Sequence, residues 1–123
     1  MTTQEVADKY YELVQRGENK KVIDEMYSEN IVSIEPENFS GVPLIVNGKE
    51  EYHQKEMKFY QIVEQMHGGY CNEPIVMGDF FICIMGMDVT MKGKERRMKH
   101  EIGVFEVENG KIIKEQFFYK DSN

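Results

Sequence analysis

The most constraining feature of this sequence is residues 96–119, RRMKHEIGVFEVENGKIIKEQFFY, which predict two long strands joined at Asn109 and Gly110. Asn-Gly supplies the positive-φ positions that tight hairpin turns and G1 bulges require. If Val107 and Lys111 flank a bulged turn, one face of the hairpin carries Glu101, Gly103, Phe105, Ile113, Glu115, Phe117 and Tyr119. That face is largely apolar, yet its two carboxylates are costly to bury without a partner or a wet cavity. We therefore expect this sheet to form the wall of a pocket.

The length and net charge of the chain limit which classes of protein it can belong to. Its 123 residues suit a single domain, 1–123, with a core of its own. A net charge of −7 argues against nucleic acid and anionic membrane as partners. No apolar run is long enough to predict a transmembrane helix, and the N-terminus lacks a signal-peptide pattern. Cys71 and Cys83 have neither redox nor zinc-site spacing, so we expect a cytoplasmic protein with reduced thiols.

Hydrophobic periodicity predicts the element order α-α-β-α-β-β-β-β. The predicted elements are a helix from Thr2 or Thr3 to Gly17, a shorter helix capped by Asn19, a strand over 31–35, a helix over 48–66, strands over 70–76 and 80–91, and the two strands of the hairpin. The intervening segment 36–48 is too rich in Pro and Gly to be regular. Helices first and an antiparallel meander last define an α+β fold. We expect three N-terminal helices packed on a strongly curved, mostly antiparallel sheet, which makes a cone with a cavity inside.

Three stretches, taken together, resemble SnoaL-like proteins of the nuclear transport factor 2-like superfamily over essentially the whole chain. They are YYELVQRGENKKVIDEMYSENIVSIEP, VNGKEEYHQ and VENGKIIKEQFFY, and they follow the family's order and spacing. The resemblance implies the cone-shaped fold. It implies no single function, because members include ketosteroid isomerases, polyketide cyclases, dehydratases, hydrolases and non-enzymatic adaptors.

The opening stretch is also similar to that of the ketosteroid isomerases. In those enzymes the matching Tyr donates to a developing oxyanion and the matching acid before Pro moves the proton. Tyr10 and Glu35 fall on these two positions, with one residue inserted between them, so the resemblance implies catalytic roles for both. Gly103 stands where the isomerases carry a protonated Asp. That departure removes one oxyanion donor, which argues against steroid isomerisation by the same mechanism.

The four candidate catalytic residues each allow two interpretations. Glu35, at the end of a strand, is a general base at the cavity mouth or a carboxylate that caps backbone amides. Tyr10 is a pocket residue or a core aromatic with a satisfied hydroxyl. Glu101 and Glu115 are expected to be cross-strand neighbours, which either share a proton or are neutralised by an Arg or a Lys.

The candidate ligand-binding residues are Tyr119, Phe117, Phe105 and His53. The aromatic residues among them suit an apolar ligand, and they equally suit an ordinary core. His53 is expected at the rim, one position off the apolar stripe of the third helix. None of the three His residues has metal-ligand spacing, so no metal and no cofactor is expected.

These observations support two functional hypotheses. The first is an enzyme that acts on a small, mostly apolar molecule by general acid/base catalysis, through isomerisation, cyclisation or dehydration. The alternative is a non-catalytic ligand-binding module or a dimeric adaptor. In both cases a homodimer is predicted through the outer face of the sheet, because a monomer would leave a broad apolar patch exposed. The residues expected on that face are Met98, His100, Ile102, Val104, Ile112 and Phe118.

Overall fold

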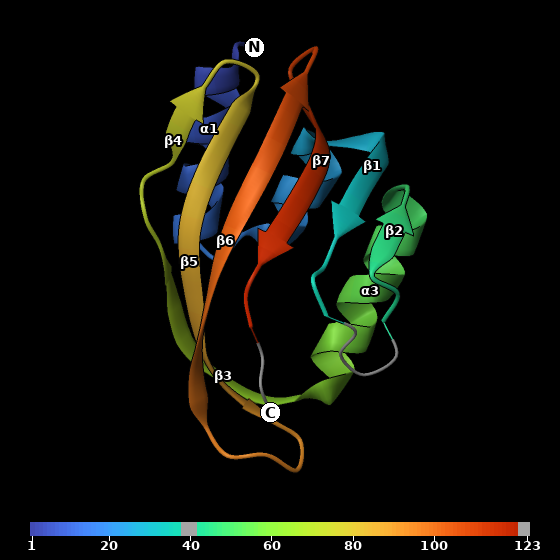
Figure 1. Cartoon of the computed structure of the whole chain (residues 1–123), viewed down its shortest axis with the longest axis vertical. Helices are drawn as coiled ribbons and strands as arrows, with labels where there is room; N and C mark the ends of the chain where they lie inside the picture. The colour runs from blue at the N-terminus through green and yellow to red at the C-terminus, as the bar shows by residue number, and fades with distance from the viewer. Residues whose placement is uncertain (38–41, 121–123) are drawn as a thin grey trace.

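The computed structural model describes residues 1–37 and 42–120, in which helices cover one side of a curved, open sheet (Figure 1). The helical elements are α1 (Thr3–Gln15), α2 (Asn19–Lys21), which continues into the π-helical turn η1 (Val22–Met26), and α3 (Lys49–Ile62). The strands are β1 (Tyr27–Ile34), β2 (Ile45–Asn47), β3 (Val63–Cys71), β4 (Ile75–Met77), β5 (Phe80–Met91), β6 (Arg97–Glu108) and β7 (Lys111–Phe118). These elements confirm the predicted α+β fold.

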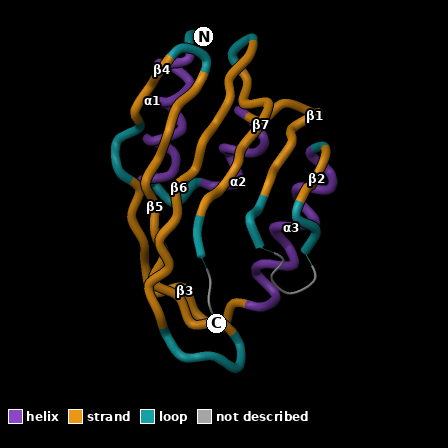
Figure 2. The backbone as a smooth tube through the Cα atoms, in the orientation of Figure 1, coloured by secondary structure: helices purple, strands orange, loops and turns teal. Residues whose placement is uncertain are grey.

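The sheet has the strand order β2-β1-β7-β6-β5-β3, with β4 paired to β5. Its pairs are antiparallel except β1 with β7, which run parallel. Figure 2 shows the helices gathered behind the strands, so the opposite face of the sheet is left uncovered by helices. None of the described helices is long and apolar enough to cross a membrane.

The first helix begins where the sequence predicts. The Thr2 hydroxyl accepts a hydrogen bond from the Glu5 amide at 3.1 Å, and the Glu5 carboxylate accepts one from the Thr2 amide at 2.9 Å. This reciprocal capping box satisfies two amides that have no partner inside the helix. The second helix differs from the prediction, because Glu18 is its N-cap and Asn19 is its first helical residue.

Two predictions were wrong: the end of the third helix, and the absence of regular structure in the segment that contains β2. The third helix ends at Ile62 and not at residue 66, and Val63 starts a strand that pairs with Met91 of β5. The segment predicted to be irregular contains β2, which pairs antiparallel with β1. In both places a neighbouring strand supplies hydrogen-bond partners that periodicity within the segment cannot reveal.

The hairpin turn is tighter than predicted and its bulge lies elsewhere. Asn109 and Gly110 both have positive φ, 51° and 75°, and Glu108 pairs directly with Lys111. The register then shifts by one residue in β7, at Ile113. As a result Ile112 is fully buried, although the sequence placed it on the outer face, and Ile113 leaves the core face that was predicted for it.

The core lies between α1 and the long strands β5 and β6. Phe81 and Phe105 stack with ring centroids 4.7 Å apart, and Tyr10 of α1 packs 4.8 Å from Phe105. Both Phe side chains are fully buried. This aromatic cluster fixes the inner face of β6, on which the acidic site residue Glu101 is also carried.

We predict that Phe105→Ala lowers the free energy of unfolding by about 3 to 5 kcal/mol, because it removes a fully buried ring and leaves a cavity. Chemical denaturation followed by circular dichroism measures the change. Met57→Ala, at a position of α3 that is 61% exposed, is the control and should change stability by about 0.5 kcal/mol or less. Equal effects of the two substitutions would contradict this account of the core.

Candidate functional site

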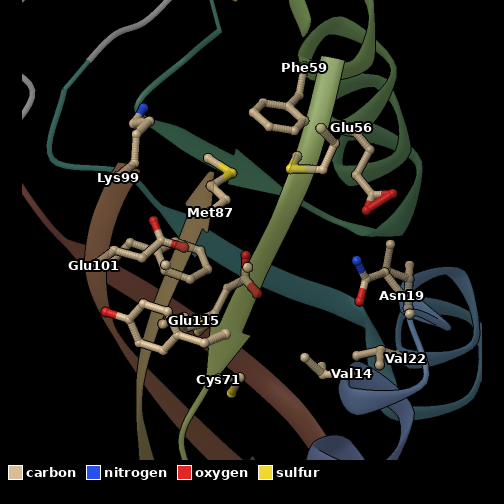
Figure 3. Close-up of a pocket in the computed structure, with 18 of the residues that line it drawn as sticks. Val14, Asn19, Val22, Glu56, Phe59, Cys71, Met87, Lys99, Glu101 and Glu115 are labelled. Carbon is tan, nitrogen blue, oxygen red and sulfur yellow. The ribbon is translucent and has the colours of Figure 1, made fainter. Parts of the chain in front are cut away.

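A pocket of about 540 Å³ lies between the inner face of the sheet and the helices. Its apolar wall comes mainly from Val14 and Val22 on the helical side and from Met85, Met87 and Phe117 on the strands. Its acidic and basic residues are Glu35, Lys55, Glu56, Lys99, Glu101 and Glu115. In Figure 3 the carboxylates of Glu101 and Glu115 point into the same space, whereas Glu56 lies on the opposite, helical side.

Glu115 is a fully buried acid at the centre of this wall. It is opposite Ser33 in the parallel β1–β7 pair, and the Ser33 hydroxyl donates to its Oε2 at 2.6 Å. The Tyr27 hydroxyl donates to its Oε1. Burial raises the pKa of Glu115, and Lys55 and these hydroxyls oppose that rise. Both carboxylate oxygens therefore have donors within the protein, which makes Glu115 a structural anchor of the pocket.

Lys55 is the cation of the site, and its side chain is only 9% exposed. It projects from α3, where its Nζ lies 2.8 Å from Glu35 Oε1 and donates to Ser33 Oγ at 2.8 Å. The distance from Nζ to Glu115 Oε2 is 4.0 Å. One ammonium group thus lies among several carboxyls, and its shortest ion pair is with Glu35.

The sequence analysis did not identify Lys55, Ser33 or Tyr27 as site residues. Lys55 lies three residues after Tyr52, on the stripe of α3 that faces inward, and its Nζ is 5.4 Å from the Tyr52 ring centroid. The three-residue spacing from Tyr52 was the feature of the sequence that could have predicted an inward-facing Lys55. A Lys on a helix is nevertheless exposed in most proteins, and its burial depends on acids supplied by distant strands.

Glu35 follows β1 directly, and its amide donates to Leu44 O at 2.8 Å. Among residues 1–37 and 42–120, its carboxylate accepts from side chains and from no backbone amide, so capping of amides, one of the two predicted interpretations, is not seen there. One oxygen pairs with Lys55 at 2.8 Å, and the other accepts from the Tyr119 hydroxyl at 2.9 Å. Burial, followed by the charge of Glu35, raises the pKa of Tyr119, so this hydroxyl remains a donor.

Glu101 differs from the other two acids on the sheet. It lines the pocket from β6, and no hydrogen bond or ion pair joins its carboxylate to another residue in the ranges 1–37 and 42–120. Burial, followed by the charges of Glu35 and Glu115, raises the pKa of Glu101 to about 7. A carboxylic acid in this state both gives and accepts a proton near neutral pH.

The predicted pairing of Glu101 with Glu115 was wrong in register. Glu115 is opposite Phe105, and Phe117 is opposite Gly103, so Glu101 lies farther along the hairpin than expected. The tighter turn moves the pairing by one residue, and the bulge in β7 moves it by one more. Both acids still line the pocket, because the pairing moved by two residues in total and a shift of two residues preserves the face.

Glu56 is the second acid of the pocket that titrates near neutral pH. Burial, followed by the charge of Glu115, raises the pKa of Glu56 to about 7. It belongs to α3 and approaches from the side of Asn19 and Val22 (Figure 3). It is thus separated from the hydroxyl-rich wall that holds Glu115.

The other predicted site residues lie in three different environments. Phe117 and Tyr119 line the pocket. Tyr10 lines it and also belongs to the core, with its hydroxyl 4.0 Å from Met85 Sδ. Phe105 is fully buried in the core and is not part of the pocket lining. His53 lies outside the pocket, with its Nε2 3.7 Å from Asp24 Oδ1.

Gly103 occupies a position that has no room for a side chain. A Cβ atom built there would lie 2.7 Å from Met85 Cε and 2.9 Å from the Phe105 ring. An acidic side chain at this place, as in the ketosteroid isomerases, would require both neighbours to move. With glycine at this position, and with Met85 and Phe105 filling the adjacent space, β6 offers no side-chain oxyanion donor there.

Neither cysteine is in a disulfide bond, and both are buried, with Cys71 in the pocket wall. Within the described part of the chain, no group of three or more His, Cys, Asp or Glu side chains is arranged to hold a metal ion.

The fold is that of a known class of small α+β proteins. The SnoaL-like domain family matches residues 1–119, and the chain belongs to this family. A protein from Mesorhizobium loti, assigned as a SnoaL-like polyketide cyclase, is 33% identical with a TM-score of 0.90, over 97% of this chain and 100% of that one. No curated protein sequence matches the chain.

Two further solved structures share the fold alone. An NTF2-like protein of unknown function from Burkholderia pseudomallei is 16% identical with a TM-score of 0.79, over 98% of this chain and 92% of that one. TerC, co-crystallised with polyporic acid, is 13% identical with a TM-score of 0.78, over 96% of this chain and 91% of that one.

We predict that Glu101→Gln stabilises the protein at alkaline pH and has less effect at pH 5. The folded state raises the pKa of Glu101 to about 7 from an ordinary value of 4.5, so it holds a proton that the unfolded chain has lost. The stability of the wild type therefore falls as pH rises through this window, and Gln escapes that loss. The difference should grow to at most about 3 kcal/mol by pH 8.5.

Urea unfolding at a series of pH values measures this difference. Glu108→Gln, an exposed substitution on the same strand, is the control and should give a constant difference from the wild type. A flat difference for Glu101→Gln as well would show that Glu101 is ionised throughout.

Proposed function

We propose that this protein binds a small, largely apolar molecule in the pocket and exchanges a proton with it through Glu101. The observation that carries the proposal is the Glu101 carboxyl group, which faces the pocket without a described partner and has a pKa of about 7. A general acid or base works best when its pKa lies near the working pH. The surrounding Met and aromatic side chains suit an apolar ligand.

The proposed reaction class is proton transfer next to a carbonyl group. The Glu101 carboxylate removes a proton from the carbon beside the carbonyl, and the electron pair of the C–H bond moves onto the carbonyl oxygen as an enolate. Where the enolate is conjugated with a C=C bond, return of the proton from Glu101 to the far carbon is an isomerisation. Where the enolate carbon attacks a second carbonyl carbon of the same molecule, a ring C–C bond forms, and the resulting alkoxide takes the proton from Glu101, which is a cyclisation. Burial raises the pKa of Tyr10 well above its ordinary value, so its hydroxyl stays protonated as a donor.

In this proposal Glu35 supports Glu101 and does not serve as the base itself. Both Glu35 oxygens accept from protein groups, Lys55 and Tyr119, which leaves this carboxylate less available to take a proton. Its negative charge is the largest electrostatic contribution to the raised pKa of Glu101, after burial. Glu35 thus sets the proton affinity of its neighbour.

The relatives support a small-molecule function. The Mesorhizobium loti protein carries the assignment of a polyketide cyclase, and TerC was crystallised with a small organic acid. Cyclase chemistry of this kind fits a pocket that contains an unpaired carboxylic acid such as Glu101. The alternative is a ligand-binding or adaptor module without turnover, which the full pairing of Glu35 and Glu115 favours.

We also propose that the chain forms a homodimer through the outer face of the sheet. Met98, Ile102 and Phe118 on that face are 44% to 47% exposed. Ile84 of β5 is directly opposite Ile102 and is exposed as well. The helices cover only the other face, so a second copy packed sheet against sheet would bury this patch. A stable interface should exceed about 1,000 Å².

We predict that the protein catalyses deuterium exchange at carbons next to a carbonyl group in small apolar ketones that it binds. Exchange in D₂O, followed by mass spectrometry, detects proton removal whatever the final product is. Glu101→Gln should lower the exchange rate by about 10² to 10⁴-fold, and the control Glu108→Gln should not. Ketones that bind but do not exchange would favour the binding module.

We predict that the wild-type protein has twice the 14.5 kDa chain mass in solution and that Ile102→Glu yields the monomer. A charge on the outer face would have to be buried in the interface, which is costly. Light scattering after size-exclusion chromatography measures both masses. Met57→Glu, an exposed position on α3, is the control and should remain dimeric. A 14.5 kDa wild-type particle at micromolar concentration would refute the dimer.

A further inference from the structure

We propose that Lys55 assigns the roles of the two neighbouring acids, because it fixes Glu35 as the anion and so leaves the exchangeable proton to Glu101. Lys55 acts through Glu35 and is therefore a positioning residue. This inference rests on the proposed function of Glu101, and it adds the group that decides which acid carries the proton.

The geometry around Lys55 carries the inference. Its Nζ is 2.8 Å from Glu35 Oε1, close enough for a charge-assisted hydrogen bond, and it donates to Ser33 Oγ at the same distance. The distance to Glu115 Oε2 is longer, at 4.0 Å. An ammonium ion in direct contact with one carboxylate favours the charged form of that carboxylate over those farther away.

The Ser33 hydroxyl extends the effect of Lys55 to the centre of the pocket wall. Ser33 accepts from Lys55 and donates to Glu115 Oε2 at 2.6 Å. Glu115 thus receives a hydroxyl donor from Ser33, while its ion pair with Lys55 is long, at 4.0 Å. The buried Lys55 ammonium thus contacts Glu35 directly and is linked to Glu115 through the Ser33 hydroxyl.

Within the described ranges, the Glu101 carboxylate has no ion pair or hydrogen bond like those of Glu35 and Glu115. The charged groups that act on it come from four elements: Glu35 after β1, Lys55 on α3, Lys99 on β6 and Glu115 on β7. The two acids raise its proton affinity more than the two lysines lower it. A negative charge on Glu35 therefore raises the proton affinity of Glu101, whose carboxyl group lines the pocket.

Carboxyl ¹³C NMR of the ligand-free protein, with labelled glutamate, tests this assignment. Single Glu→Gln variants identify the signals of Glu35 and Glu101. In the wild type, the Glu101 signal should move with a midpoint at about pH 7. In Lys55→Met, the Glu35 signal should lie closer to the protonated position than in the wild type at the same pH, because the ammonium beside its carboxylate is lost.

The matched control is Lys58→Met, an exposed lysine on the same helix, which should leave both signals unchanged. A Glu35 signal that stays at its carboxylate position down to the same pH in Lys55→Met as in the wild type would overturn the inference. If Lys55→Met does not fold, Glu35→Gln in the presence of Lys55 replaces it. The midpoint of Glu101 should then fall, and an unchanged midpoint would overturn the inference.

These titrations are independent of the deuterium-exchange assay. A normal NMR result without deuterium exchange would refute the proposed catalysis and keep the role of Lys55. Deuterium exchange that depends on Glu101, with an unchanged Glu35 signal in Lys55→Met, would refute the role of Lys55 and keep the proposed catalysis.

Discussion

Glu115 has no contact with solvent, and a buried carboxylate must find its hydrogen-bond donors inside the protein. Those donors come from parts of the chain far apart in sequence. The Ser33 and Tyr27 hydroxyls come from β1, and Lys55 on α3 reaches the same group through Ser33. The parallel pairing of β1 with β7 places Ser33 opposite Glu115. The need of Glu115 for internal donors therefore holds β1, β7 and α3 next to one another. It also determines where the polar side chains of the pocket lie.

One buried ammonium cannot satisfy three carboxyls equally. Lys55 forms its close ion pair with Glu35, while Glu115 depends mainly on hydroxyl donors. Glu101 is left facing the pocket, where burial and its acidic neighbours raise its pKa to about 7. The same arrangement that stabilises the wall thus leaves one carboxyl free to exchange a proton. When neighbouring acids receive different numbers of hydrogen-bond donors, their pKa values move apart, so that one acid is neutral while another is charged.

The family relationship accounts for the fold, whereas the chemistry of the pocket depends on local residues. SnoaL-like and NTF2-like proteins share the curved sheet and its helical cover, and this chain follows them over nearly its whole length. The isomerase-like position is occupied by Gly103, which has no acidic side chain, and Met85 and Phe105 fill the space beside it. Glu101, on the same strand, supplies the acid of this pocket from a different position. Fold and site therefore have to be argued separately.

The sequence alone determined the fold class, the first helix, the long strand 80–91 and the hairpin, because each rests on local signals: a capping box, an apolar alternation and an Asn-Gly turn. It also placed Glu101 and Glu115 on one face, since the period of a strand is two residues. Only the tertiary structure decided that helix 3 ends at Ile62, that β7 bulges at Ile113 and that Lys55 is buried. Those outcomes depend on partners contributed by distant strands. Phe105 became core and His53 became surface for the same reason, because which face of an element is covered depends on what packs against it.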